Sequence, residues 1–200
     1  MNHGIFVSVD GPSGAGKSSF IKILSERLSA SLPIFLTKEP SETEFGSFVK
    51  KNEQNMSGLE YAQLIWADRC FHVSNYILPH LDLGKVVISD RYIESSIVLQ
   101  GFDGVTIERI WDLNKDFIIP NLSIILLAEP DTLESRLSER NSLSAFELKM
   151  TREQELEGYK GAVDFLSAKG FRYVVYQNNT LDDLYKNIDD IYNKILSMAR

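Results

Sequence analysis

The sequence predicts an α/β fold in which a five-stranded parallel sheet is flanked by helices on both faces. Two observations carry this prediction. Five short and almost continuous apolar runs, as expected of strands covered on both faces, alternate with longer segments whose apolar residues recur at helical spacing. The predicted strands span residues 4–10, 33–37, 85–90, 122–127 and 172–176. Strands that alternate with helices favour a doubly wound sheet, because right-handed crossovers place helices on either face.

Size and composition indicate one domain over residues 1–200. A chain of 200 residues buries close to 70% of its unfolded surface, which is enough for a substantial core. Hydrophobic residues make up 44% of the chain and charged residues 24%, with no break in composition along it. These values exclude a disordered or low-complexity protein.

Charge and cysteine content limit the partners and the compartment. The net charge of −7 argues against a broad nucleic-acid-binding face. The single cysteine, Cys70, excludes an intramolecular disulfide and favours a reducing compartment. No apolar run approaches the roughly 18 residues needed to cross a bilayer. We therefore expect a cytoplasmic protein that binds neither nucleic acid nor membrane.

The helices between the strands have recognisable starts and ends. Capping-box patterns open helices at residues 57–60, 131–134 and 151–154. The first helix is predicted to run to Leu78 and to end at Pro79, while Gly170 follows the end of the third. The last helix begins after Thr180. Its apolar stripe, predicted to pack on the sheet, comprises Leu181, Leu184, Tyr185, Ile188, Ile191, Tyr192, Ile195 and Leu196.

A phosphate-binding loop lies between the first strand and the first helix. The pattern Gly-x-x-x-x-Gly-Lys-Ser runs from Gly11 to Ser18. Glycines let backbone amides approach an anion at the helix N-terminus, Lys17 can reach β- and γ-phosphates, and the Ser18 hydroxyl can bind Mg²⁺. The predicted ATP-binding residues are Gly11, Pro12, Ser13, Gly14, Ala15, Gly16, Lys17, Ser18 and Ser19. A transferase, a hydrolase or a switch could all carry this loop.

A second anion site is predicted beside this loop. Thr37-Lys-Glu-Pro40 follows the second strand, Trp66-Ala-Asp-Arg69 lies within a helix, and Asp90-Arg-Tyr92 follows the third strand. Strand ends of a parallel sheet meet at one edge, where ligands bind. Arg69 and Arg91 are fork-shaped cations suited to the phosphate of an acceptor. Asp90 is placed to help hold Mg²⁺ or its waters, and Asp10 could orient the acceptor.

In order and spacing, these motifs resemble the thymidylate kinases, a family of P-loop nucleoside monophosphate kinases. The resemblance extends through residues 90–101 and 121–131 and so covers nearly the whole chain. It implies that ATP, with Mg²⁺, donates its γ-phosphate to a deoxynucleoside monophosphate, with dTMP the expected acceptor and dTDP the product. It also implies a homodimer, and that Arg69 and Arg91 hold the acceptor phosphate.

The expected site residues follow from the motifs and the resemblance together. The catalytic residues are Lys17, Asp90, Arg91 and Arg140. The acceptor-binding residues are Asp10, Glu39, Pro40, Ile65, Trp66, Arg69, Arg91, Ser95, Ser96, Leu99 and Gln100. The metal ligands are Ser18 and Asp90.

The chain departs from the family in the base pocket. Ile65 stands where the family usually has a phenylalanine stacked on thymine, and the neighbouring Trp66 is rotated by about 100° around the helix. Leu99 replaces a tyrosine that lies against the sugar. A different or modified nucleotide, or a nucleoside, is therefore an alternative acceptor.

The chain also departs from the family in the lid, near residues 138–150. Ser144 and Ala145 occupy the positions of an Asp-Arg pair, ahead of Phe146-Glu147. Arg140 matches a family lid position and is expected to close over the donor phosphates, where a cation can contribute roughly 10³-fold to the rate. Arg136 and Arg152 are further candidates. Without such a cation, the alternative is a nucleotide-binding protein with little transfer activity.

Overall fold

The computed structural model describes residues 4–199, and residues 1–3 and 200 lie outside the described part. Its strands are β1 (Ile5–Asp10), β2 (Ile34–Lys38), β3 (Val86–Asp90), β4 (Leu122–Leu127) and β5 (Tyr173–Gln177). They pair in parallel in the order β2-β3-β1-β4-β5. The predicted fold class is confirmed, and every strand begins within one residue of its predicted start.

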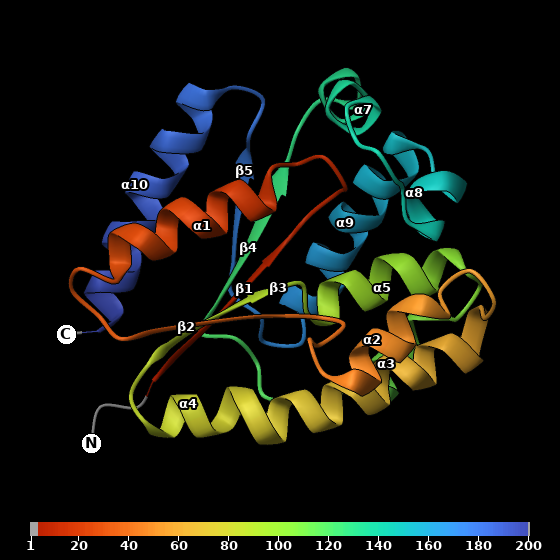
Figure 1. Cartoon of the computed structure of the whole chain (residues 1–200), viewed down its shortest axis with the longest axis horizontal. Helices are drawn as coiled ribbons and strands as arrows, with labels where there is room; N and C mark the ends of the chain where they lie inside the picture. The colour runs from red at the N-terminus through yellow and green to blue at the C-terminus, as the bar shows by residue number, and fades with distance from the viewer. Residues whose placement is uncertain (1–3, 200) are drawn as a thin grey trace.

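Helices cover both faces of this sheet (Figure 1). They are α1 (Lys17–Leu28), α2 (Glu44–Lys51), α3 (Gly58–His72), η1 (Val73–Ile77), α4 (Leu78–Asp82), α5 (Ile93–Phe102), α6 (Ile107–Asn114), α7 (Pro130–Ser138), α8 (Ala145–Lys149), α9 (Arg152–Ser167) and α10 (Leu181–Met198). One buried cluster lies between the sheet and the α1–α10 pair, and the other packs α3, α5 and α9 against the opposite face. Among the described residues, no helix has the length and apolar character to cross a membrane.

The carboxyl edge of the sheet brings the predicted motifs together. The register pairs Val9 and Lys38 with Asp90, so the segments after β1, β2 and β3 all start at the same edge. Strands β2 and β3 lie on one side of β1 in the sheet, and β4 and β5 lie on the other side. Open α/β sheets bind ligands at this edge, where the strand order reverses.

The predicted end of the helix at Pro79 is wrong. α3 begins at Gly58 as expected, although the Ser57 side chain makes no capping hydrogen bond. The chain then continues through the π-helical turn η1 into α4, which ends at Asp82. The Leu78 amide reaches the Val73 carbonyl in this wider turn, and Pro79 falls in the first turn of α4. Proline is tolerated in the first turn of a helical segment.

Two further helix predictions need correction. α7 begins at Pro130 rather than with a capping box at Asp131, because a proline suits the first helical position. The capping box at Thr151 is confirmed. In α10, Leu184, Ile188, Ile191 and Ile195 are buried as predicted. Leu181 and Tyr185 are exposed, at 71% and 55%, and so lie outside the buried stripe of α10.

Candidate active site

The loop after β1 folds around its own lysine. Gly11 has a φ of 140°, and a Cβ at this position would lie 2.1 Å from the Leu126 carbonyl oxygen, so only glycine fits. Nζ of Lys17, the first residue of α1, donates to the carbonyl oxygens of Gly11 at 2.7 Å and Pro12 at 2.8 Å. Ala15 is buried beneath the loop. The charged end of Lys17 is therefore held inside the anion-binding loop.

Beside the loop lies a groove of about 340 Å³, which we call the P-loop groove. Six of the predicted ATP-binding residues line it: Ser13, Gly14, Gly16, Lys17, Ser18 and Ser19. Gly11, Pro12 and Ala15 are not among its lining residues. The other lining residues are Asp90, Arg91, Arg136 and Arg140. Backbone amides, a helix N-terminus and four cations make this groove suited to a polyphosphate.

Burial lowers the pKa of Lys17 to about 8, and the positive charge of Arg91 adds to this effect. A bound polyphosphate favours the protonated amine, so binding of a polyphosphate would take up a proton wherever free Lys17 is neutral. We expect the Kd for ATP to be flat below a pH of about 8 and to rise about 10-fold per pH unit above it. Titrations between about pH 7 and pH 9.5 measure this slope. Lys17→Arg stays charged throughout and should have a flat profile; equal slopes for both proteins would contradict the assignment.

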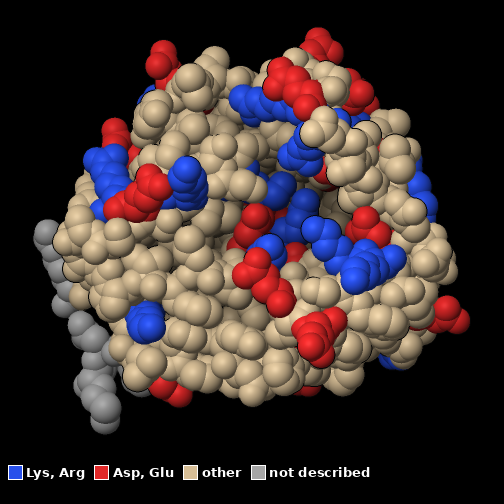
Figure 2. Space-filling model, viewed as in Figure 1, with Lys and Arg blue, Asp and Glu red and all other residues tan. Residues whose placement is uncertain are grey.

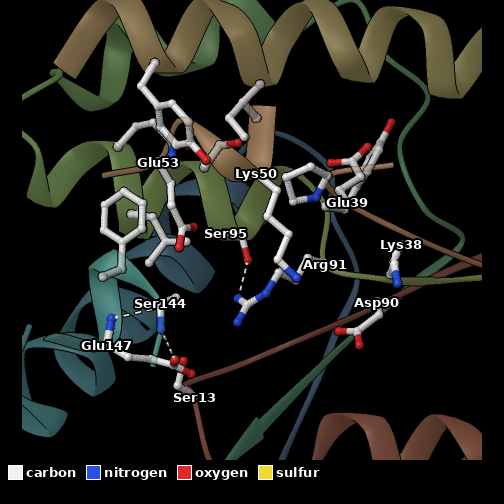
Figure 3. Close-up of a pocket in the computed structure, with 18 of the residues that line it drawn as sticks. Ser13, Lys38, Glu39, Lys50, Glu53, Asp90, Arg91, Ser95, Ser144 and Glu147 are labelled. Atoms are coloured by element: carbon white, nitrogen blue, oxygen red, sulfur yellow. Dashed lines mark hydrogen bonds between the residues drawn. The ribbon is translucent and has the colours of Figure 1, made fainter. Parts of the chain in front are cut away.

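Arg91 is fixed in a strained backbone conformation at the mouth of the groove. Its φ is 73°, a left-handed value that costs a non-glycine residue about 1–3 kcal/mol. Nη1 of Arg91 donates to the hydroxyl oxygens of Ser95 at 2.8 Å and Tyr159 at 3.2 Å, and it lies 3.7 Å from the Asp10 carboxylate. Figure 3 shows the guanidinium extending into the pocket, with a bond to Ser95. Strained backbone of this kind is typical of functional sites.

Asp10 supports the site from beneath and does not contact the cavity. Its carboxylate is fully buried. It accepts hydrogen bonds from the hydroxyl groups of Ser95 and Tyr159, each at 2.7 Å, and from the Tyr92 amide at 3.0 Å. A buried carboxylate needs such partners. These contacts favour an indirect form of the expectation that Asp10 orients the acceptor, in which Asp10 positions Ser95 and Arg91.

Next to the groove lies a cavity of about 460 Å³, the acceptor cavity, whose size is typical of a small-molecule site. Nine of the predicted acceptor residues line it: Glu39, Pro40, Ile65, Arg69, Arg91, Ser95, Ser96, Leu99 and Gln100. Trp66 is 39% exposed and is not among the lining residues, so this cavity gives no support to the expectation that Trp66 binds the acceptor. The reason is the rotation of about 100° per helical residue, which turns Trp66 away from the side that presents Ile65.

Arg69 has a closer buried counter-ion than Arg91, whose distance to the buried Asp10 is 3.7 Å. It pairs with Glu39 at 2.6 Å, and it also donates to Asn114 and to the Ser96 hydroxyl. Burial alone would raise the pKa of Glu39, but Arg69 and His72 outweigh it and hold the pKa below its usual value. Arg69 is thus already neutralised, which argues against the expectation that it holds the acceptor phosphate.

Four residues border both the P-loop groove and the acceptor cavity: Ser13, Asp90, Arg91 and Arg140. A chemical group transferred from a ligand in the P-loop groove to a ligand in the acceptor cavity must move past these side chains. Burial alone would lower the pKa of Arg91, but the nearby Tyr159, Asp10 and Asp90 raise it overall, so Arg91 remains a cation. We call these four residues the junction.

The junction has an acceptor oxygen suited to Mg²⁺. Oδ1 of Asp90 is buried without a hydrogen-bond partner among the described residues, and Ser18 lines the same groove. Residues 4–199 contain no group of three or more His, Cys, Asp or Glu side chains that could hold a metal ion. Mg²⁺ commonly binds through one or two side chains together with substrate phosphates, and Ser18 and Asp90 fit that pattern.

The three candidate lid arginines occupy different places. Arg140 pairs with Glu147 at 2.7 Å and borders both parts of the site. Arg136 borders the P-loop groove and donates to the carbonyl oxygen of Gly14 at 3.1 Å. Arg152 is buried, donates to the Met150 carbonyl, and lines neither. The structure therefore places Arg140, of these three, at the junction.

Ser144 and Ala145 start the lid helix. The Ser144 side chain caps α8 in a capping box with Glu147. The amide of Ala145 donates to the Glu53 carboxylate at 3.0 Å, which joins the lid to the end of α2. Figure 3 shows Glu53, Ser144 and Glu147 on the same side of the cavity.

Sequence reasoning missed several residues of the site. The cavity is also lined by Lys38, Lys50, Glu53, Tyr61, Phe146 and Glu147. Lysine and arginine side chains gather in and around the hollow on this face (Figure 2). Lys38 lies within the Thr37–Pro40 motif, so the sequence could have predicted that Lys38 lines the cavity. Phe146 and Glu147 lie in the expected lid, whereas Lys50, Glu53 and Tyr61 lie in segments without a motif and reach the site only through the fold.

A family model and several relatives of similar sequence are described as thymidylate kinases. The family model described as thymidylate kinase matches residues 9–187. A probable thymidylate kinase of Caldivirga maquilingensis is 38% identical over 148 residues, which cover 72% of each chain. A thymidylate kinase of Staphylococcus epidermidis is 32% identical over 207 aligned positions, covering 98% of each chain. A probable thymidylate kinase of Thermococcus gammatolerans is 32% identical over 199 positions, covering 92% of this chain and 94% of the relative.

Proposed function

This chain belongs to the thymidylate kinase family, and we propose that it transfers the γ-phosphoryl group of ATP to dTMP, giving ADP and dTDP. The observation that carries the proposal is the junction. A groove suited to a polyphosphate and a separate cavity share Ser13, Asp90, Arg91 and Arg140, so two phosphates bound side by side would meet there.

The proposed chemistry depends on alignment and charge. An oxygen of the acceptor phosphate is already anionic near neutral pH, so its attack on the γ-phosphorus needs no strong general base. The bond to the β–γ bridging oxygen breaks as the new P–O bond forms. Lys17 binds the donor phosphates, Arg91 the acceptor phosphate, and Arg140 the group in transit. Each cation stabilises charge that would otherwise repel the second phosphate.

The proposal includes a Mg²⁺ ion held by Ser18, Asp90 and the phosphate oxygens of ATP. Support comes from the unpartnered Asp90 oxygen and from the position of Ser18 in the P-loop groove. When bound, the ion neutralises charge on the β- and γ-phosphates.

Turnover with a panel of acceptors tests the proposed function. Release of ADP is measured with dTMP, dUMP, dCMP, dGMP and dAMP, and with the corresponding nucleosides. We expect the highest kcat/KM with dTMP. A different preferred acceptor would favour the alternative that Ile65 and Leu99 suggest, namely another or a modified nucleotide. Background release with every acceptor, while ATP still binds, would instead show a nucleotide-binding protein.

Replacing Arg140 with alanine tests the lid. Arg140 is half exposed and paired with Glu147, and it is the lid arginine that borders both sites. We expect kcat to fall by roughly 10²-fold, as for the loss of one aligned donor, with little change in the Kd for ATP. An unchanged kcat would remove Arg140 from the mechanism.

The proposal also includes a cytoplasmic homodimer. The segment from α3 to α4 exposes several large apolar side chains, including Leu59, Trp66, Phe71, Tyr76 and Leu78. An exposed apolar patch of this kind is typical of an interaction surface. Sedimentation should give twice the chain mass of 22.7 kDa, and a monomer at micromolar concentration would contradict this part of the proposal.

A further inference from the structure

We propose that Phe146 of the lid helix α8 is the ring on which the acceptor base packs, so that binding of the base also helps to position Arg140. This inference rests on the proposed function. It assigns the aromatic contact to the lid rather than to the α3 position occupied by Ile65, and both residues line the cavity.

The position of the phosphate determines where the base lies. The acceptor phosphate belongs at the junction, since the cations Arg91 and Arg140 border both the P-loop groove and the acceptor cavity there. Away from the junction, the lining of the acceptor cavity includes the apolar or neutral side chains of Tyr61, Ile65, Leu99, Gln100 and Phe146. A nucleoside monophosphate with its phosphate at the junction would extend its base toward these groups.

Phe146 is the ring best placed for this contact. Tyr92 also lines the cavity, but it has no exposed surface and its ring packs against Phe6 and the Arg69 guanidinium. Tyr61 is 2% exposed, whereas Phe146 is 6% exposed. The centroids of the Tyr61 and Phe146 rings are 6.3 Å apart, with their planes tilted by 40°. Tyr61 therefore supports Phe146 from α3, and Phe146 presents more surface to a ligand.

The neighbours of Phe146 connect the base contact with the junction. The preceding residue, Ala145, donates its amide to Glu53 on the cavity wall. The following residue, Glu147, holds Arg140 at 2.7 Å. Packing of a base on Phe146 would thus favour the position of α8 in which Glu147 holds Arg140 at the junction. Binding energy from a remote part of a substrate can be used in this way to align the reacting groups.

A comparison of two acceptors tests the contact directly. The Kd values of dTMP and of 2-deoxyribose 5-phosphate, which lacks the base, are measured by calorimetry for the wild type and Phe146→Ala. We expect the substitution to weaken dTMP binding by roughly 10-fold to 100-fold, as for loss of an aromatic contact to a base, and to leave 2-deoxyribose 5-phosphate unaffected. Equal losses for both ligands would show that the ring only supports the fold. No loss with dTMP would also overturn the proposal.

Turnover and control variants test the connection to Arg140. Phe146→Ala should lower kcat with dTMP as well as raise KM, and Phe146→Leu, which keeps most of the packing volume, should retain the native unfolding temperature while losing part of the affinity. Leu148→Ala is the matched control, since Leu148 is 66% exposed on the same helix and does not line the cavity. The kcat and KM of Leu148→Ala with dTMP should equal those of the wild type. A raised KM with unchanged kcat would refute the connection. A wild type that fails to bind dTMP would refute the proposed function instead.

Discussion

Lys17→Ala is expected to abolish measurable phosphoryl transfer and to leave the fold intact. Lys17 is the lysine that the loop encloses, with Nζ bonded to the carbonyl oxygens of Gly11 and Pro12. A bound polyphosphate would replace these partners with charged ones, which form stronger hydrogen bonds. We expect kcat/KM to fall by roughly 10³-fold or more, because the interaction is strongest when charge develops on the transferring group.

The fold should tolerate this substitution because, among the described residues, no carboxylate forms an ion pair with the buried amine of Lys17. Its removal therefore leaves no buried carboxylate without its partner. The hydrogen bonds of Lys17 are to backbone carbonyls, and burial already lowers its pKa. Thermal unfolding measures this part of the prediction. Lys22→Ala is the matched control, since Lys22 is an exposed lysine of the same helix, and it should keep both activity and unfolding temperature. Retained transfer by Lys17→Ala would contradict the donor assignment.

The predicted site residues that the structure brings together most completely are those encoded by contiguous sequence. The P-loop groove is formed largely by the segment that predicted it, because a strand, a glycine-rich turn and a helix suffice to create an anion site. Strand boundaries were equally accessible, since apolar runs between helical segments depend on local pattern alone.

The rest of the site depends on contacts that local pattern does not encode. The Tyr159 hydroxyl bonds to Asp10 across 149 residues of sequence, and the lid reaches α2 through Ala145 and Glu53, which are 92 residues apart. The end of the long helix was missed because a π-helical turn accommodates Pro79. Such contacts arise from tertiary packing, which can override local preference.

The two arginines show how a motif can identify a residue and leave its role open. The motifs predict that both Arg69 and Arg91 bind a phosphate, because the forked donors of a guanidinium match the geometry of a phosphate group. Packing separates them. Arg69 faces the buried Glu39 at 2.6 Å, whereas Arg91 lies 3.7 Å from Asp10, with the Asp10 carboxylate shared among several other donors. Arg91 thus retains more of its charge for a ligand.

Arg91→Ala is accordingly expected to reduce kcat/KM for dTMP by roughly 10³-fold, comparable to the loss at Lys17. Arg91 contributes to the binding of the acceptor and to the charge balance at the junction, since it borders both the P-loop groove and the acceptor cavity. KM for dTMP should rise and kcat should fall, while the Kd for ATP should change much less. Binding and single-turnover measurements separate these effects.

Arg91→Lys tests whether charge alone is enough. Lysine keeps the positive charge but cannot reproduce the fork that bonds Ser95 and Tyr159 while facing a phosphate. We expect it to recover only part of the lost activity. Arg109→Ala, which removes an exposed arginine of α6, is the control and should behave as wild type. Full recovery by lysine would mean that the site needs only a nearby positive charge. The fork of the Arg91 guanidinium would then have no role of its own in catalysis.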